Sequence, residues 1–216
     1  MSGLRTAGLL GFVLATCVAI IAAGGGWPFL GRPVAIAYLA LWLVWWLAIA
    51  LGRQRGVESK YDRSQAGIIA LGILALVALI VVVPWEYGRF SGPLPRDSWL
   101  AWMGLAVFAL GIGLQVAAFR SLRGMYTSRL GIQPEHRLVS SGPYHWIRHP
   151  GYLSNLLCLL GIGLAMSSLL GLGVSLAVIP LILARIRQEE SMLLAEFGDA
   201  YREYQSRTHR FIPGLF

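Results

Sequence analysis

Residues 142–152, which read GPYHWIRHPGY, combine groups that can do chemistry with groups that fix the backbone. Arg148 and His149 are adjacent, and Pro143 and Pro150 restrict the chain on either side of them. The segment leads directly into 34 residues without charge. An arginine and a histidine at such a boundary are costly to desolvate, so they stay in water or bind something. The segment is therefore a candidate site, although a basic loop before a Pro-marked helix start would look similar.

Two adjacent carboxylates follow the uncharged stretch. From Arg185 the chain reads RIRQEESMLLAEFGDAYREYQSRTHRFIPGLF, with apolar residues at helical spacing and an interruption near Gly198, which predicts a C-terminal amphipathic helix. Glu189 lies four residues after Arg185, where a surface ion pair would contribute only a few tenths of a kcal/mol. Glu190 has no opposite charge at that spacing, so we interpret it as a ligand group.

The composition predicts a membrane protein. Apolar residues make up 56% of the chain, charged residues make up 13%, and the mean hydropathy is +0.65, which together argue against a soluble domain of 216 residues. Apolar runs near the roughly 20 residues that cross a bilayer predict four spans, at Ala7–Ala23, Val34–Leu51, Ala66–Val83 and Ser98–Phe119.

The last apolar stretch, Gly151–Ala184, is too long for one helix across a core of about 30 Å and too short for two full spans with a turn. We therefore expect a hairpin of two short helices that turns near Ser167 to Gly171. The expected fold is all-α and polytopic: four spans, a helical hairpin and a C-terminal cytoplasmic amphipathic helix. It forms a single membrane domain over residues 1–216.

The distribution of Lys and Arg predicts the orientation. With the N-terminus in the cytoplasm, fifteen of the eighteen basic residues lie inside and only Arg32, Arg89 and Arg96 lie outside. Both termini and both large hydrophilic segments, 120–150 and 185–216, are then cytoplasmic. The net charge of +8 is explained by this topology and by anionic membrane lipid, so no nucleic-acid partner is predicted.

Several other patterns favour structural readings. The Gly-x-Gly pairs lie within apolar helices with no preceding strand, so they indicate close helix packing rather than dinucleotide binding. Cys17 and Cys158 are interpreted as small buried residues. The four histidines lack the spacing of metal ligands, so no metal is predicted. Trp42, Trp45 and Trp46 are expected to pack or anchor the second span. The Gly-x-Gly pairs are Gly111/Gly113, Gly161/Gly163 and Gly171/Gly173.

The motif LVSSGPYHWIRHPGYLSN, followed by a hairpin-length apolar run and EESMLLAEFGDAYREYQSRTHRFIP, resembles the isoprenylcysteine carboxyl methyltransferase and phospholipid methyltransferase family of integral membrane enzymes. The resemblance covers residues 138–213. It implies S-adenosylmethionine as the methyl donor, bound on the cytoplasmic side between the loop and the glutamate pair. Residues 1–119 would then be a four-span part and residues 120–216 the cofactor-binding catalytic part.

By motif position, the resemblance implies the site residues. Arg148 and Glu190 are the catalytic candidates, and the cofactor-binding candidates are Gly142, Pro143, Tyr144, His149, Pro150, Tyr152, Glu189 and Glu190. One departure stands out, because the family often has Gly two residues after the Tyr of its RHPxY motif and this chain has Ser154. The first four spans carry no matching motif, so the resemblance says little about the acceptor.

These residue types suit the cofactor, which carries a sulfonium, an ammonium, a carboxylate, a ribose and an adenine. Either glutamate can accept from the ammonium or the ribose, and His149 can hold the carboxylate or the adenine edge. Tyr144, Trp146 or Tyr152 can stack on adenine or face the sulfonium. Methyl transfer then requires mainly that two substrates are held in line in a water-poor pocket.

The acceptor is expected to be lipophilic, of lipid or prenyl type, and to enter from the bilayer. A carboxylate acceptor would need a cation such as Arg148 or Arg123, whereas an amine would need a base such as Glu190 or His149. Gln115 either lines the entry route or makes an interhelical hydrogen bond. A bacterial inner membrane is the expected location. The alternatives are an NADPH-dependent reductase of sterol-reductase type and a non-catalytic membrane assembly protein.

Overall fold

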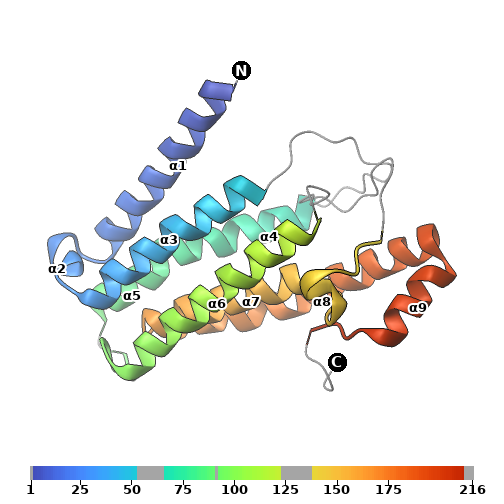
Figure 1. Cartoon of the computed structure of the whole chain (residues 1–216). Helices are drawn as coiled ribbons and strands as arrows, with labels where there is room; N and C mark the ends of the chain where they lie inside the picture. Colours follow the sequence, from blue (N-terminus) through green and yellow to red (C-terminus); the bar gives the residue numbers. More distant parts are fainter. Residues whose placement is uncertain (1, 53–65, 91, 123–137, 212–216) are drawn as a thin grey trace.

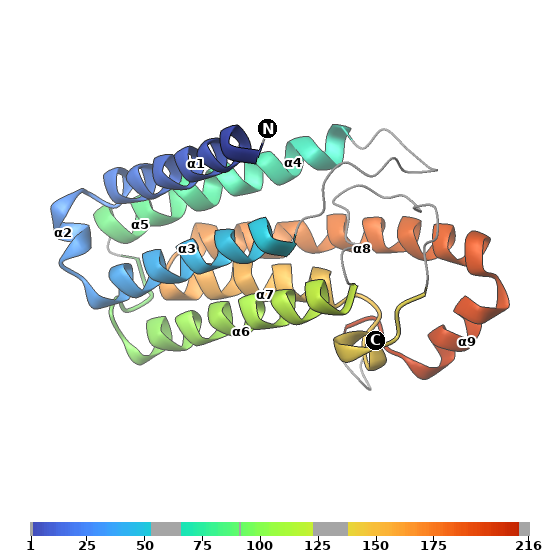
Figure 2. The same cartoon turned by 45° about the horizontal axis from the view of Figure 1, so that its top comes forward.

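The computed structural model describes residues 2–52, 66–90, 92–122 and 138–211. Within these residues the chain is helical and contains no strand, in agreement with the all-α prediction. Figures 1 and 2 show the long helices running side by side as a bundle. The elements are α1 (Ser2–Ala23), α2 (Trp27–Leu30), α3 (Pro33–Gly52), α4 (Ala66–Val77), η1 (Ala78–Val82), α5 (Val83–Arg89), α6 (Trp99–Leu122), η2 (Gly142–His145), α7 (Pro150–Ala165), α8 (Leu169–Phe197) and α9 (Asp199–Arg207).

The second, third and fourth predicted spans coincide with described helices long and apolar enough to cross a membrane, although the fourth helix begins at Trp99 and not at Ser98. The first predicted span, Ala7–Ala23, lies in α1, whose apolar part is shorter, and α8 supplies the remaining long apolar helix. By length and hydropathy, the described stretches that can cross a membrane are Pro33–Gly52, Ala70–Arg89, Trp99–Leu122 and Leu169–Phe197, and the shorter apolar helices are Leu10–Ala23 and Pro150–Ala165. The chain therefore has the polytopic membrane architecture that its composition predicts. Arg123, one of the two cations considered for a carboxylate acceptor, lies outside the described residues.

The third predicted span is longer than expected, because helical structure continues past Val83 to Arg89. Pro84 lies in the first turn of α5 and cannot donate the backbone hydrogen bond that an α-helix requires there. The five residues of η1, just before α5, are π-helical, which accommodates the irregularity without ending the helix.

The hairpin turns where the sequence predicts, at residues 166–168 between α7 and α8. The expectation of two short helices is wrong for the second arm. The first, α7, has 16 residues, but α8 has 29 and continues without a break into the charged tail. The tail breaks only at Gly198, whose φ of 53° lies in the left-handed region, and the separate amphipathic helix α9 follows it.

Glu86 fixes the start of α8 at the end of the bundle where the hairpin turns. Its carboxylate accepts hydrogen bonds from the backbone N–H groups of Leu169 and Leu170, each at 3.2 Å, and from the hydroxyl of Ser168. The Ser168 hydroxyl also accepts from the Gly171 N–H at 2.8 Å. A buried carboxylate at a helix N-terminus satisfies donors that have no partner inside the helix.

Glycines bring α6 and α7 into close contact. A Cβ atom at Gly161 would lie 2.4 Å from the backbone nitrogen of Phe108, and one at Gly111 would lie 2.8 Å from the sulfur of Cys158. No side chain fits in either place. Gly111 and Gly161 therefore serve helix packing, as predicted for the Gly-x-Gly pairs, whereas a Cβ atom at Gly113 or Gly173 would meet nothing within 4 Å.

The core between α3, α6 and α7 is aromatic and contains a short polar chain. Trp42 and Trp45 are buried, so they pack the second span into the bundle. The Trp45 indole donates to Gln115 Oε1 at 2.8 Å, and the Gln115 amide lies 3.4 Å from Asn155 Oδ1. Gln115 thus joins three helices, which confirms the interhelical hydrogen bond among the two predicted roles.

The two ends of the bundle differ in character. In both Figure 1 and Figure 2, α2 and the turn between α7 and α8 lie at one end, while the last turns of α6, η2 and α9 lie at the other. The second half of α8 extends beyond the bundle at this latter end and α9 folds back from it. The predicted site residues of the loop and of the glutamate pair meet here.

Candidate active site

The loop before α7 is held by the C-terminal tail. Residues Ile147 and His209 form a parallel backbone bridge. The Arg148 N–H donates to the His209 carbonyl at 2.7 Å, and the His209 N–H donates to the Trp146 carbonyl at 3.1 Å. The His149 N–H donates to the Arg210 carbonyl at 3.3 Å. Backbone pairing thus fixes the Arg-His-Pro segment against a tail about 60 residues further along the chain.

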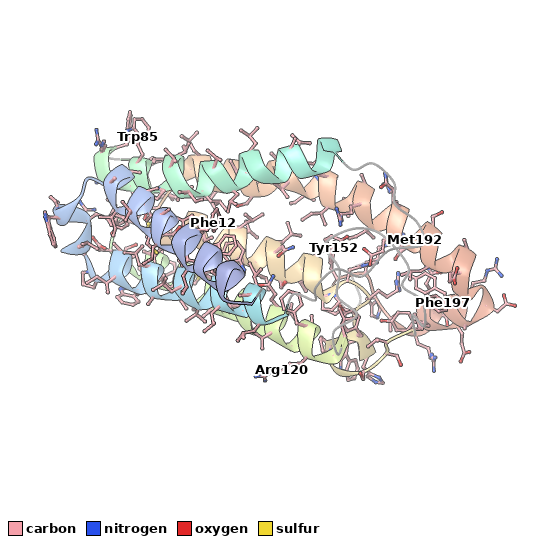
Figure 3. All side chains as sticks on the ribbon, turned by 90° about the horizontal axis from the view of Figure 1, so that it is seen from above. Phe12, Trp85, Arg120, Tyr152, Met192 and Phe197 are labelled. Atoms are coloured by element: carbon pink, nitrogen blue, oxygen red, sulfur yellow. The ribbon has the colours of Figure 1, made fainter. Side chains whose placement is uncertain are left out.

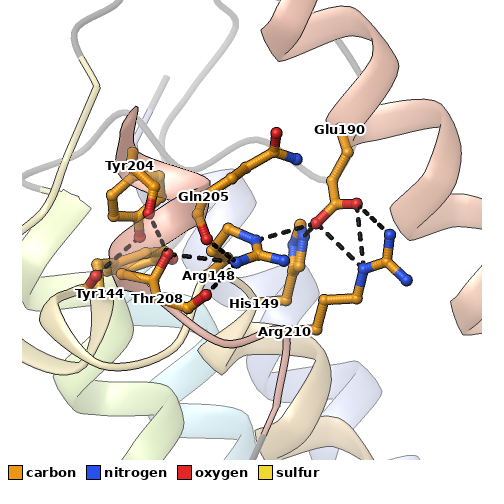
Figure 4. A network of polar contacts seen from close by, with 8 residues as sticks. All are labelled: Tyr144, Arg148, His149, Glu190, Tyr204, Gln205, Thr208 and Arg210. Atoms are coloured by element: carbon orange, nitrogen blue, oxygen red, sulfur yellow. Dashed lines mark hydrogen bonds and ion pairs between the residues drawn. The ribbon is translucent and has the colours of Figure 1, made fainter. Parts of the chain in front are cut away.

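The Glu190 carboxylate is the centre of the site and is buried, with a relative exposure of 6%. Its Oε1 accepts from Arg148 Nε at 3.1 Å and lies 3.2 Å from His149 Nε2. Its Oε2 accepts from Arg210 Nη2 at 2.8 Å and from Arg210 Nε at 3.1 Å. Figure 4 shows these contacts converging from the loop, from α8 and from the tail. Charge-assisted contacts of this kind are the strong class of protein hydrogen bond.

Arg148 makes further contacts that tie the loop to the tail. Its Nη1 donates to the Gln205 carbonyl at 3.1 Å and also to the carbonyl of Thr208. Its side-chain exposure is 10%. The planar guanidinium can serve these separate acceptors at once, whereas an ammonium cannot match the fork geometry. In this structure Arg148 therefore braces three segments, and the catalytic roles predicted for Arg148 and Glu190 stay predictions.

A second polar group lies on the neighbouring face of α8. The Tyr152 hydroxyl donates to Glu189 Oε2 at 2.7 Å and accepts from Arg185 Nε at 2.8 Å. The simple reading of Arg185 and Glu189 as a surface ion pair is incomplete, because the half-buried tyrosine of α7 lies between them. In Figure 3, Tyr152 lies nearer the middle of the bundle than Met192 and Phe197 on the outer part of α8.

Consecutive glutamates on one helix reach different partners because successive side chains are rotated by about 100° around a helix of 3.6 residues per turn. Glu189 meets the α7 tyrosine, while Glu190 meets the loop and the tail. The ring of His149 lies 5.8 Å from that of Tyr152, so the two groups of contacts are adjacent. Together they form one site of mixed charge.

The remaining predicted residues lie at the rim of this site. Gly142, Pro143 and Tyr144 form η2, and the Tyr144 carbonyl accepts from the Tyr204 hydroxyl at 2.8 Å, which attaches η2 to α9. Pro150 starts α7 and is buried. Trp146, one of three candidate stacking residues, is 66% exposed and so offers no enclosed stacking surface here.

Ser154, the departure from the family motif, is accommodated within helix packing. Its side chain is fully buried, and its hydroxyl donates to the Gly151 carbonyl of its own helix at 2.7 Å. A Cβ atom at Gly111 of α6 would lie 3.0 Å from the Ser154 carbonyl oxygen, so Ser154 stands at the close contact between α6 and α7.

Sequence reasoning missed the residues that the tail contributes. Arg210, Thr208 and Tyr204 all take part in the network of Figure 4. Helical spacing gives no signal for them, because the partners of Glu190 lie 20, 41 and 42 positions away in the sequence. Arg185 does have a signal in the sequence beyond its spacing to Glu189, because it is the first charged residue after the uncharged stretch.

The tail residues respond electrostatically to this environment. The hydrogen bond to Glu190 raises the pKa of Arg210 above its ordinary value, because the carboxylate stabilises the charged guanidinium. Burial raises the pKa of Tyr204 to about 12, which keeps its hydroxyl protonated and able to donate to the Tyr144 carbonyl.

The described residues include no cluster of three or more His, Cys, Asp or Glu that could hold a metal ion.

A bundle of helices able to cross a membrane, with a buried mixed-charge site at one end of the bundle, defines an integral membrane protein. The profile of the isoprenylcysteine carboxyl methyltransferase (ICMT) family matches residues 102–195. The cobalt-zinc-cadmium resistance protein CzcN of Cupriavidus metallidurans is 30% identical over 165 residues, which are 76% of this chain and 70% of that protein.

The chain is also similar in sequence to methyltransferases from eukaryotes. The protein-S-isoprenylcysteine O-methyltransferases of Tribolium castaneum and Homo sapiens are 32% and 28% identical over 127 residues, which are 57% of this chain and 45% of each enzyme. A solved eukaryotic intramembrane Ras methyltransferase shares the fold, with a TM-score of 0.63 and 22% identity over 94% of this chain and 74% of that one. The chain belongs to the isoprenylcysteine carboxyl methyltransferase family of integral membrane methyltransferases.

Proposed function

We propose that this protein transfers a methyl group from S-adenosylmethionine to a lipophilic acceptor of prenyl type that reaches the site from the bilayer. The observation that carries the proposal is the placement of Tyr152, Arg185 and Glu189. This polar group lies where the uncharged part of the hairpin ends, directly beside the buried Glu190 cluster. An acceptor with an apolar tail and a polar head would meet both environments at this point.

The residues present fit the methyl donor. Its zwitterionic end needs carboxylates and cations, and its adenine and sulfonium suit aromatic faces. The site supplies Glu189 and Glu190, the guanidiniums of Arg148 and Arg210 bound to Glu190, and the rings of His149 and Tyr152. When bound, S-adenosylmethionine supplies a methyl carbon already activated by its sulfonium. The protein therefore needs no covalent nucleophile, and its task is to hold the acceptor in line and exclude water.

We assign binding of the methyl donor to the predicted cofactor residues. They are Gly142, Pro143, Tyr144, His149, Pro150, Tyr152, Glu189 and Glu190. Within this group Glu190 holds the loop and the tail at fixed distance through its contacts with Arg148 and Arg210. Arg148 acts here as a positioning residue, because the contacts of its guanidinium are with protein acceptors.

We assign the acceptor to Arg185. A carboxylate acceptor is already nucleophilic and requires a positioned cation rather than a base. Arg185 is the first charged residue after the uncharged stretch of the hairpin, and the Tyr152 hydroxyl fixes the direction of its Nε. The names of the Tribolium and human relatives specify O-methylation of an isoprenylcysteine, which supports a carboxyl group as the acceptor.

The same proposal places the site at the cytoplasmic face of a bacterial inner membrane. The count of basic residues supports this orientation. The opposite end of the bundle carries Arg32 and Arg96, whose guanidinium carbons lie 4.9 and 5.8 Å from the centroid of the Tyr87 ring. Arg32 and Arg96 therefore lie together at Tyr87, at the end of the bundle that the count of basic residues predicts to be outside.

Titration of the purified protein in detergent tests the methyl donor. We expect heat of binding with S-adenosylmethionine and none with NADPH. Radiolabelled S-adenosylmethionine should then transfer its methyl group to an N-acetyl S-farnesyl cysteine in a base-labile ester. N-acetylcysteine without the prenyl chain and phosphatidylethanolamine are the control acceptors. Binding of NADPH alone, or of neither cofactor, would overturn the proposal, and methylation of the lipid amine would overturn the assignment of the acceptor.

A further inference from the structure

Tyr201 is a buried residue of α9 whose hydroxyl is unpartnered in the described part of the chain. The side chain is 1% exposed, and its hydroxyl has no hydrogen-bond partner among the described residues. It lies on α9 one turn before Tyr204, whose own hydroxyl is bonded to η2. A buried hydroxyl without a partner is destabilising, and such groups in native proteins call for an explanation.

Tyr201 packs beside Tyr204, with their ring centroids 6.0 Å apart, and the charges of the site act on its hydroxyl. Burial raises the pKa of its hydroxyl, and the charge of Glu190 raises it further, so the group remains a proton donor at neutral pH. The charges of Arg148 and Glu189 also act on it. The hydroxyl is therefore a buried donor that is subject to the charges of the Glu190 cluster and lacks an acceptor among the described residues.

The charge of the cluster indicates which acceptor is missing. Arg148 and Arg210 together bring two positive charges to the single carboxylate of Glu190. Glu189 does not compensate for the difference, because the Tyr152 hydroxyl connects it to Arg185. Among these described residues one positive charge is left over. An incoming carboxylate would satisfy both the surplus charge and the Tyr201 donor.

We propose that the Tyr201 hydroxyl donates a hydrogen bond to the carboxylate of the amino-acid end of the methyl donor. This inference rests on the proposed function and adds a residue of α9 to the binding site. It also explains why an uncompensated polar atom is kept at this position. Phenylalanine would fill nearly the same volume without the cost of burying a hydroxyl, and a bound carboxylate would give the oxygen the partner that the described residues do not supply.

Binding of two probes to Tyr201→Phe tests the assignment. S-adenosylhomocysteine carries the carboxylate, whereas 5′-methylthioadenosine has the same nucleoside and thioether but no amino-acid end. We expect the affinity for S-adenosylhomocysteine to fall about tenfold, as for the loss of one hydrogen bond to a charged group. The affinity for methylthioadenosine should not change. An unchanged affinity for both probes, or an equal loss for both, would overturn the inference.

Thermal unfolding without ligand provides the second readout. The melting temperature of Tyr201→Phe should be unchanged or higher, because the variant loses only an unpartnered oxygen. Tyr204→Phe, which removes the bond to Tyr144, should melt at a lower temperature. An equally large decrease for Tyr201→Phe would mean that its hydroxyl has a structural partner, and the inference would fail.

Tyr38→Phe is the matched control. Tyr38 also has a fully buried hydroxyl without a partner among the described residues, but it lies in α3 between the rings of Trp42 and Phe108. Its variant should leave the affinity for S-adenosylhomocysteine unchanged. Wild-type protein that binds neither S-adenosylmethionine nor S-adenosylhomocysteine would refute the proposed function itself, whereas normal binding by both wild type and Tyr201→Phe would refute only this inference.

Discussion

Arg148 and Glu190 are 42 positions apart in the sequence, and Arg148 Nε donates to Glu190 Oε1 over 3.1 Å. Both side chains are largely buried, with exposures of 10% and 8%. The bond joins the loop before α7 to the charged half of α8. Arg210, in the C-terminal tail, donates to the other oxygen of the same carboxylate. Three segments that contribute to the site are thereby held in one arrangement, so changes to either residue should act on both stability and binding.

Glu190→Gln should weaken S-adenosylmethionine binding by about 1.5–3 kcal/mol, the range for hydrogen bonds to charged groups. It should also lower the melting temperature, because Arg148 and Arg210 then lose a buried counter-charge. Titration and thermal unfolding measure the two effects. Glu203→Gln is the control, since the Glu203 side chain is 69% exposed and forms an exposed ion pair with Arg207 at 3.5 Å. Wild-type affinity in a folded Glu190→Gln variant would remove Glu190 from the binding site.

Arg148→Lys should lower S-adenosylmethionine affinity and the melting temperature together, because an ammonium cannot replace a guanidinium that serves Glu190, Gln205 and Thr208. The control is Arg202→Lys, whose arginine is 66% exposed and bonded to Asp199. Turnover, affinity and unfolding are measured on the same preparation. A fall in turnover at unchanged affinity and stability would instead assign Arg148 to the acceptor.

Arg185→Lys should lower kcat/KM for a prenylcysteine acceptor at least tenfold while S-adenosylmethionine affinity stays within about twofold, because the lost contact belongs to the acceptor. Arg187→Lys, two positions along α8 and exposed, should have wild-type kinetics. Acceptor titration with each variant separates kcat from KM. Unchanged kcat/KM in Arg185→Lys would refute its role.

Glu86→Ala should destabilise the protein by about 1–3 kcal/mol, because it leaves the N–H groups of Leu169 and Leu170 and the Ser168 hydroxyl without their acceptor. Thermal unfolding measures the loss. Binding of S-adenosylmethionine by the folded fraction should be unaffected, since Glu86 caps α8 at the opposite end of the bundle. Equal melting temperatures for variant and wild type would contradict the capping role.

A cysteine placed at Arg207, which is 65% exposed on α9, should react with an impermeant reagent only after the cells are opened. A cysteine placed at Trp27, 84% exposed on α2 at the other end of the bundle, should react in intact cells. The experiment follows labelling of each variant against a parent without accessible thiols. The reverse pattern would invert the topology and remove the site from the cytoplasm.

The sequence by itself determined the membrane class, the place of the second, third and fourth predicted spans and the turn of the hairpin. These follow from the length of apolar runs and from where they stop, which are local properties of the chain. It also predicted that the loop with Arg148 and His149 and the pair Glu189 and Glu190 form one site. Their closeness in space is now explained by the antiparallel arrangement of α7 and α8.

The tertiary structure alone decided how those residues are partnered. Glu190 looked unpaired because a helix offers neighbours only three and four positions away, whereas its cations come from the loop and the tail. The same limit hid the hydroxyl of Tyr201, since whether a buried oxygen has a partner depends on every segment packed around it. The length of α8 was also a tertiary outcome. The sequence predicts that the charged half is helical, but it does not predict that this half continues the apolar arm as one helix of 29 residues, whose side chains find partners on α7, the loop and the tail.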